Sequence, residues 1–130
     1  MTKAPRTEHV EAVTLMKVVK LHEMRYPQLK LFFAVPNGGD RNKIVAAKMK
    51  AEGVRPGVPD YFLPVPHGTY NGLVIELKSM TGYASREQKD WIEQLRHYGW
   101  RAEVCRGWEA AWSLILDYLK IDIEIHPKIW

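Results

Sequence analysis

The sequence predicts an α/β fold in which helices flank a mixed β-sheet, and two observations support this prediction. Segments with apolar residues at helical spacing alternate with short runs rich in β-branched and aromatic residues, which are typical of strands. Turn and capping residues bound these segments and give the order α-β-α-β-β-α-β-α. A chain of 130 residues without repeats predicts a single domain over residues 1–130, with its core at about 8–119.

The first helix is expected to begin after Thr7, a suitable N-cap, and to stop before Pro27. Glu8 and Glu11 fall in its first turn, where carboxylates interact favourably with the helix dipole. The residues that then recur at helical spacing are Val10, Val13, Lys17, Val18 and Leu21.

A strand and a second helix are expected next. Residues 31–35, LFFAV, are short, apolar and aromatic, as in a buried strand, and the turn residues NGGD at 37–40 end it. Residues 42–52 predict a helix that Gly53 closes in the usual C-terminal position.

Two further strands, DYFLPV at 60–65 and LVIELK at 73–78, are joined by a short turn and predict a hairpin. A capping box formed by Ser85 and Gln88 then starts a helix over 86–98.

The last predicted elements are a strand and a helix. RAEVC at 101–105 has the alternation of a strand, and an apolar helix begins near Trp108 and continues to Leu119. The tail that follows, IDIEIHPKIW, has no clear assignment.

Composition and charge narrow the function classes. The net charge of +4 and the pI near 9.2 suit a polyanionic partner but are weak evidence alone. No apolar run approaches the roughly 20 residues that span a bilayer, and the N-terminus lacks a signal-peptide pattern. With a single cysteine, Cys105, a cytoplasmic location is expected. The absence of a P-loop motif argues against a nucleotide cofactor, and the histidine spacing argues against a zinc site.

Asp60, Glu76 and Lys78 form the constellation with the clearest chemical meaning. Glu76 and Lys78 are two apart on one strand and project from the same face, and hairpin pairing would bring Asp60 close to Glu76. Two carboxylates and the backbone carbonyl of Leu77 would offer oxygen ligands to Mg²⁺ or Mn²⁺. Lys78 would then position the attacking water or stabilise charge on a phosphate in the transition state.

A structural interpretation of the same residues stays open at this point. Asp60 can be a turn residue that binds loop backbone, and Glu76 with Lys78 can be a solvated pair on an exposed strand face. The surrounding segment LVIELKS is strongly apolar, however, and charges in such a strand need solvent or a partner.

The order G-V-P-D60, then L-V-I-E76-L-K78-S, then G-Y and Gln88 resembles the VRR-NUC family of PD-(D/E)XK nucleases, in a stand-alone form like those of bacterial viruses. The resemblance runs from about Glu8 to about Ala110. It implies a PD-(D/E)XK core and a metal-dependent DNA endonuclease with Asp60, Glu76 and Lys78 as the catalytic set.

The resemblance carries further implications. It places an acidic residue of the first helix near the metal, and Glu8 fits better than Glu11. Gln88 would support the catalytic site, although its alternative role is the capping box. Four-way (Holliday) junctions as substrate and a homodimer with two active sites are also expected from the stand-alone viral members.

Basic residues around the second predicted helix suggest a contact with the DNA backbone, with a solvated helix face as the alternative. Asn37, in the Asn-Gly turn, is a further candidate contact from a loop. These candidates are Asn37, Arg41, Lys43, Lys48, Lys50 and Arg55. Two other functions stay open: a DNA-binding module of the same fold without catalysis, and a nuclease that acts on RNA or unbranched DNA.

Overall fold

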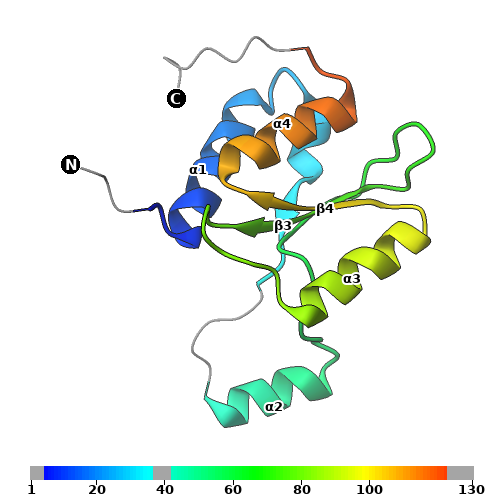
Figure 1. Ribbon diagram of the computed structural model, residues 1–130. Helices are drawn as coiled ribbons and strands as arrows, with labels where there is room; N and C mark the ends of the chain where they lie inside the picture. Colours follow the sequence, from blue (N-terminus) through cyan, green and yellow to red (C-terminus); the bar gives the residue numbers. More distant parts are fainter. Residues whose placement is uncertain (1–4, 37–41, 123–130) are drawn as a thin grey trace.

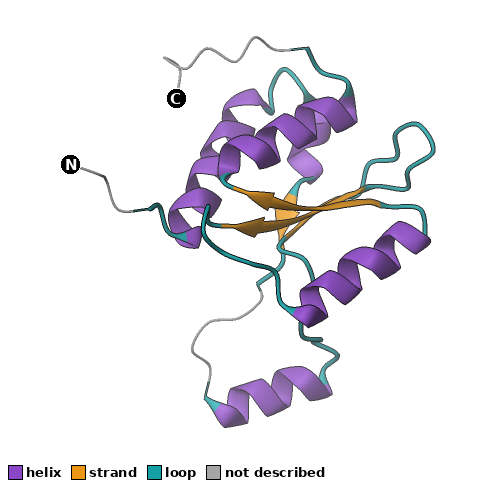
Figure 2. Ribbon diagram, viewed as in Figure 1, coloured by secondary structure: helices purple, strands orange, loops and turns teal. Residues whose placement is uncertain are grey.

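The computed structural model describes residues 5–36 and 42–122, which form an α/β fold with a mixed sheet between layers of helices (Figures 1 and 2). The predicted order of helices and strands is confirmed, with one 3₁₀ helix in addition. The elements are α1 (Glu8–His22), η1 (Pro27–Leu31), β1 (Phe33–Ala34), α2 (Lys43–Ala51), β2 (Tyr61–Leu63), β3 (Leu73–Lys78), α3 (Arg86–His97), β4 (Arg101–Arg106) and α4 (Trp108–Leu119).

The four strands lie in the order β1-β2-β3-β4. β2 and β3 pair antiparallel, with Tyr61 opposite Ile75, which confirms the expected hairpin. β3 and β4 are parallel because α3 connects them as a crossover, and their register places Lys78 opposite Arg106. The C-terminal ends of β3 and β4 therefore lie side by side at one end of the sheet.

Each face of the sheet has its own hydrophobic cluster, and the residues of β3 alternate between them. Leu73, Ile75 and Leu77 belong to the larger cluster, which α1 and α4 cover on one face (Figure 1). Val74 belongs to the smaller cluster together with Ile92 of α3. Because side chains alternate along a strand, Glu76 and Lys78 project from the same face as Val74, the face of α3.

The buried face of α1 differs from the one that the apolar spacing predicts. The structure buries Glu11, Leu15, Val18 and Val19, whereas Val10 is 43% exposed and Val13 is 39% exposed. The helix is rotated toward Glu11 because this carboxylate has partners inside the protein, as described below. A polar residue at the centre of the buried face is invisible to a pattern of apolar residues.

The prediction of a buried strand over 31–35 is only partly right. Leu31 ends η1, and β1 has two residues that pair with β2 at the edge of the sheet, with Phe33 opposite Phe62. Phe32 is buried, but Phe33 is 48% exposed. The turn predicted at 37–40 and most of the C-terminal tail lie outside the described residues.

α2 begins at its N-cap Asn42, as predicted, and stands apart from the rest of the described chain (Figure 1). None of its residues is buried, and Ile44 is 82% exposed. Within the described ranges, no helix has the length and apolar character needed to cross a membrane.

Candidate active site

The carboxylate of Asp60 is fixed against β3 at the start of the hairpin. Asp60 immediately precedes β2, and its Oδ2 accepts a hydrogen bond from the backbone N–H of Leu77 at 2.8 Å. Tyr61 and Ile75 form the pair of the hairpin that is furthest from its turn. Asp60 comes just before Tyr61, beside the part of β3 that extends beyond the paired residues of β2. The side chain thus replaces a strand partner and is held beside Glu76.

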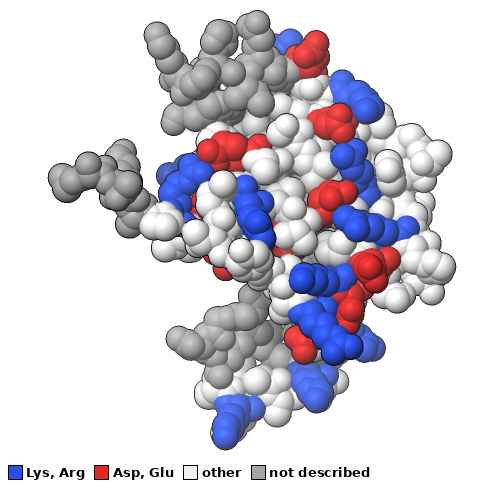
Figure 3. Space-filling model, viewed as in Figure 1, with Lys and Arg blue, Asp and Glu red and all other residues white. Residues whose placement is uncertain are grey.

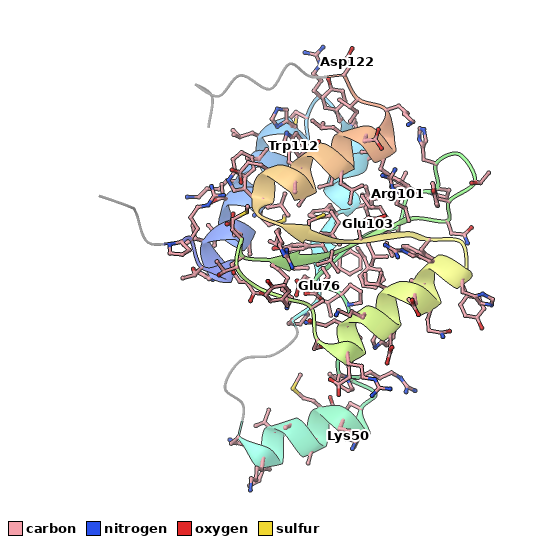
Figure 4. All side chains as sticks on the ribbon, viewed as in Figure 1. Lys50, Glu76, Arg101, Glu103, Trp112 and Asp122 are labelled. Atoms are coloured by element: carbon pink, nitrogen blue, oxygen red, sulfur yellow. The ribbon has the colours of Figure 1, made fainter. Side chains whose placement is uncertain are left out.

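Glu76 is a buried carboxyl group with little to stabilise its charge. The residue is 1% exposed, and neither carboxylate oxygen accepts a hydrogen bond from the described part of the chain. Burial is the main cause that raises its pKa to about 9, the neighbouring Asp60 raises it further, and Lys78 opposes the shift. Figure 4 shows Glu76 on the β3 ribbon, on the side of α3. Without a bound cation, this group therefore favours its neutral form at neutral pH.

Lys78 lies between two carboxylates at the C-terminal end of β3. Its Nζ is 3.6 Å from Oε2 of Glu76 and 3.6 Å from Oε1 of Glu8. The Lys78 side chain is 10% exposed, whereas the Glu8 side chain is 54% exposed. The ammonium group is consequently held at the rim between the buried carboxyl group and solvent.

Two hollows meet at these side chains and give access to them. One has a volume of about 210 Å³ and is lined by Glu8, His9, Asp60 and Leu77, among others. The other, of about 370 Å³, is lined by Glu8, Asp60, Lys78 and Gln88, together with the loop at 56–58 and the start of α3. Asp60 and Lys78 therefore contact space large enough for a phosphate group and water, although Glu76 itself is covered.

The two acidic residues of the first turn of α1 have different surroundings. Glu8 faces Lys78 and lines both hollows. Glu11 is fully buried, and its Oε1 accepts the backbone N–H of Trp108 at 3.1 Å, while Oε2 pairs with Nε of Arg6 at 3.1 Å. Of these two, Glu8 is the one beside the candidate site, and Glu11 caps the N-terminus of α4.

The capping box predicted for α3 is present, and it includes Gln88. Ser85 Oγ accepts the N–H of Gln88 at 3.2 Å, and Oε1 of Gln88 accepts the N–H of Ser85 at 2.7 Å. Gln88 also lines the larger hollow. One residue thus starts the helix and lies at the border of the candidate site, so the two roles proposed for Gln88 are geometrically compatible.

The donors gathered here fit a hard divalent cation with few protein ligands. Among the described residues, no group of three or more His, Cys, Asp or Glu side chains is arranged to hold a metal ion. The two unpartnered oxygens of Glu76 and the carboxylate of Asp60 remain as a pair of oxygen donors. The Leu77 carbonyl leaves β3 on the same side as its N–H, which faces Asp60. Two carboxylates, a carbonyl and waters are a donor set that suits Mg²⁺.

The basic residues proposed to bind DNA are separated from this centre. Lys43, Lys48 and Lys50 are exposed on α2, and Arg55 is exposed on the loop that follows. Lys and Arg side chains lie over α2 without acidic neighbours in the helix, whereas both signs mix over α3 (Figure 3). Asn37 and Arg41 lie outside the described residues.

Reasoning from the sequence missed Arg106, the partner of Lys78 in the register of β3 and β4. The only available signal was its place at the end of a strand, and the sequence does not reveal which strand lies beside β3. His9 is exposed and lines the smaller hollow together with Asp60.

Carboxylates and a lysine at one end of a mixed α/β sheet suit chemistry on a phosphate ester, and comparison with known proteins identifies the family. The VRR-NUC domain matches residues 13–109, which is most of the chain. The chain therefore belongs to the VRR-NUC family, a family of nucleases, as the sequence motifs indicated. A solved structure described as a VRR_NUC domain protein is similar over 92% of this chain and 93% of its own, with a TM-score of 0.78 and 30% identity. The comparison with curated proteins gave no match.

Proposed function

We propose that this protein is a metal-dependent DNA endonuclease with a PD-(D/E)XK active site formed by Asp60, Glu76 and Lys78. The observation that supports this most strongly is the buried Glu76. Its two oxygens have no donor among the described residues, next to a second carboxylate and a lysine. A buried carboxylate destabilises the protein unless it is protonated or its charge is paired. A bound cation would provide that pairing.

Each member of the set has a separate task in this proposal. Asp60, Glu76 and the carbonyl of Leu77 would hold Mg²⁺ or Mn²⁺, which would supply positive charge to the phosphate and a water molecule of lowered pKa. Lys78 stands between the buried carboxylate and the hollow, where its ammonium group orients a water molecule or stabilises charge on the phosphate oxygens. Glu8, exposed on the other side of Lys78, holds the ammonium group in place at the rim of the site.

Gln88 is a positioning residue in this proposal. Its Oε1 accepts the N–H of Ser85, which restrains the side chain, and the residue lines the larger hollow. The start of α3 is also held by the loop at 56–58, because Gly57, with φ +81°, lies against Glu87 so closely that a Cβ would be 2.8 Å from its backbone. This packing holds the loop that leads to Asp60 against the start of α3, which carries Gln88.

We further propose that the substrate is branched DNA, such as a four-way junction, and that the enzyme acts as a homodimer. Cutting two strands of a branch needs two sites, and each copy supplies one. The projecting α2, with Ile44 82% exposed and three lysines, supports this because it offers an apolar contact for a second copy and cations for the DNA backbone. Sedimentation that shows only monomers at micromolar concentration would contradict the dimer.

The deciding experiment is cleavage of a labelled four-way junction beside a linear duplex of the same sequence, in Mn²⁺, in Mg²⁺ and in EDTA. We expect metal-dependent cutting that Glu76→Gln abolishes while the variant stays folded. Glu93→Gln is the matched control, because Glu93 is an exposed glutamate on α3 away from the site. An RNA duplex in a parallel reaction tests the alternative substrate.

If folded wild-type protein binds DNA but cuts neither DNA nor RNA, the active-site proposal fails and the DNA-binding module takes its place. If the linear duplex is cut as fast as the junction, the proposal of branch selectivity fails and the nuclease stands. The cytoplasmic location stays a prediction from the sequence.

A further inference from the structure

The loop between β3 and α3 passes directly beside the candidate active site. Its first residues make a turn in which the N–H of Gly82 donates to the carbonyl of Ser79 at 3.1 Å. A Cβ added at Gly82 would lie 3.5 Å from Cβ of Lys78 and 3.1 Å from the hydroxyl of Ser79. The turn therefore packs against the base of the Lys78 side chain.

Tyr83 follows this turn and forms a pair with Arg106 at the end of β4. The guanidinium carbon of Arg106 lies 4.5 Å from the centre of the Tyr83 ring, within cation–π distance. Nε of Arg106 donates to the carbonyl of Gly82 at 3.0 Å, which ties the loop to β4 a second time. The ring nevertheless remains 77% exposed. It is an aromatic surface held in place by a cation and open to solvent.

The register of β3 and β4 places this pair beside the catalytic lysine. Arg106 is the partner of Lys78, so the two side chains leave neighbouring strands on the same face, roughly 4.8 Å apart at the backbone. None of the ion pairs within the described ranges includes Arg106. A second cation, with its charge not cancelled by an acid, thus adjoins the place where the scissile phosphate is expected.

We propose that Tyr83, supported by Arg106, is a stacking platform for an unpaired base of the nucleic-acid strand whose phosphate lies at Lys78. The proposal rests on the nuclease function proposed above and adds a residue that determines its substrate. Any base can stack on an aromatic ring, so the platform reads no sequence. A base inside a duplex has both faces covered by its neighbours, and only an unpaired or terminal base offers a free face.

A purely structural role for Tyr83 accounts poorly for its exposure. An aromatic side chain that fastens a loop by packing is at least partly buried, as Trp100 is, whose ring lies edge-on to Phe62 beside the smaller cluster. The ring of Tyr83 is instead exposed to solvent, at the border of a site that is expected to bind a polyanion. Arg106 then has two uses, because its positive charge attracts the backbone while its planar group supports the ring.

The test compares two DNA substrates of one sequence: a branched one with a single unpaired 2-aminopurine at the branch point, and a fully paired one. The measured quantity is the ratio of kcat/KM on the branched substrate to that on the paired substrate, in Mn²⁺. We expect Tyr83→Ala to lower this ratio by about 5- to 150-fold, which corresponds to about 1–3 kcal/mol of base stacking. Tyr83→Phe should keep the ratio. Tyr98→Ala, which removes a 68% exposed tyrosine from the far end of α3, is the matched control and should leave the ratio unchanged.

Two further measurements separate stacking from loop structure. Tyr83→Leu keeps apolar bulk without a ring and should behave like Tyr83→Ala, and 2-aminopurine fluorescence should be quenched on binding of wild type but not of either variant. If Tyr83→Ala lowers kcat/KM equally on both substrates, or if wild type leaves the fluorescence unchanged, the stacking platform is refuted. Cleavage by wild type would in that case still support the proposed nuclease function. Wild type that cuts neither substrate would overturn the proposed function together with the platform.

Discussion

Replacing Glu76 by Gln should change how the stability of the metal-free protein depends on pH. Burial raises the pKa of Glu76 to about 9 from an ordinary value of 4.5. Between these pH values the folded protein holds a proton that the unfolded chain has released. The folded pKa is the higher one, so the stabilisation is complete below about pH 4.5 and is lost as the pH rises toward 9.

The magnitude follows from the binding of one proton. Each pH unit in this window lowers the free energy of unfolding of wild type by up to about 1.4 kcal/mol relative to a chain without the titrating group. From pH 6 to pH 8 the difference between Glu76→Gln and wild type should therefore grow by up to about 2.7 kcal/mol in favour of the variant. For a domain of this size the corresponding relative shift in Tm is on the order of 10 °C.

The assay is urea unfolding of wild type and Glu76→Gln at several pH values between 6 and 8.5 in EDTA, followed by circular dichroism. Titrating groups that do not interact with Glu76 are common to both proteins and cancel in the difference. Glu93→Gln repeats the chemical change at an exposed site and should run parallel to wild type. Parallel curves for Glu76→Gln and wild type would refute the reasoning, because Glu76 would then carry its charge in the folded protein without a cation.

Three further predictions concern single residues. Lys78→Ala should lower kcat by roughly 10²- to 10³-fold, as expected for loss of a group that stabilises transition-state charge, while Mn²⁺ still raises Tm; loss of the Mn²⁺ effect would mean that Lys78 shapes the metal site. Glu11→Ala should cost about 1–3 kcal/mol in urea unfolding, because it removes the acceptor of the buried Trp108 N–H while Arg6 keeps its pair with Glu109, and a loss below about 0.5 kcal/mol would contradict the capping role. Gln88→Glu preserves a capping box and should unfold within about 0.5 kcal/mol of wild type. Reduced cleavage by that variant would reveal a role in the site, and full cleavage would leave only the cap.

Local chemistry made most of the fold predictable. Thr7, Asn42 and Ser85 each accept a backbone hydrogen bond as N-caps of the helices they precede. The continuous apolar run of β3 reflects a strand buried on both faces, between α1 and α4 on one side and α3 on the other. The proximity of Asp60 to Glu76 also followed from the sequence, because a hairpin with a short connection leaves few alternatives for pairing.

The features that escaped prediction depend on contacts between elements far apart in the chain. The buried Glu11 accepts a hydrogen bond from the N-terminus of α4, 97 residues away. That helix has no side-chain cap of its own, because its N-cap residue is Gly107, with φ +86°. Arg106 lies beside Lys78 only because β4 is parallel to β3 in the register that pairs these two residues. The sequence does not reveal that pairing. Periodicity within one segment carries neither kind of information.

The first turn of α1 connects the stability of the fold to the geometry of the site. Glu8 and Glu11 are three residues apart, so they lie on the same side of the helix, and they reach the ends of two neighbouring parallel strands. Glu8 meets Lys78 at the end of β3, and Glu11 meets the chain just after β4, where α4 begins. Because one rigid turn makes both contacts, a substitution that releases Glu11 also frees the helix end that holds Glu8 against Lys78. Glu11 thus holds the helix turn that carries Glu8, and we expect its loss to lower kcat along with stability, through the proposed catalytic residue Lys78.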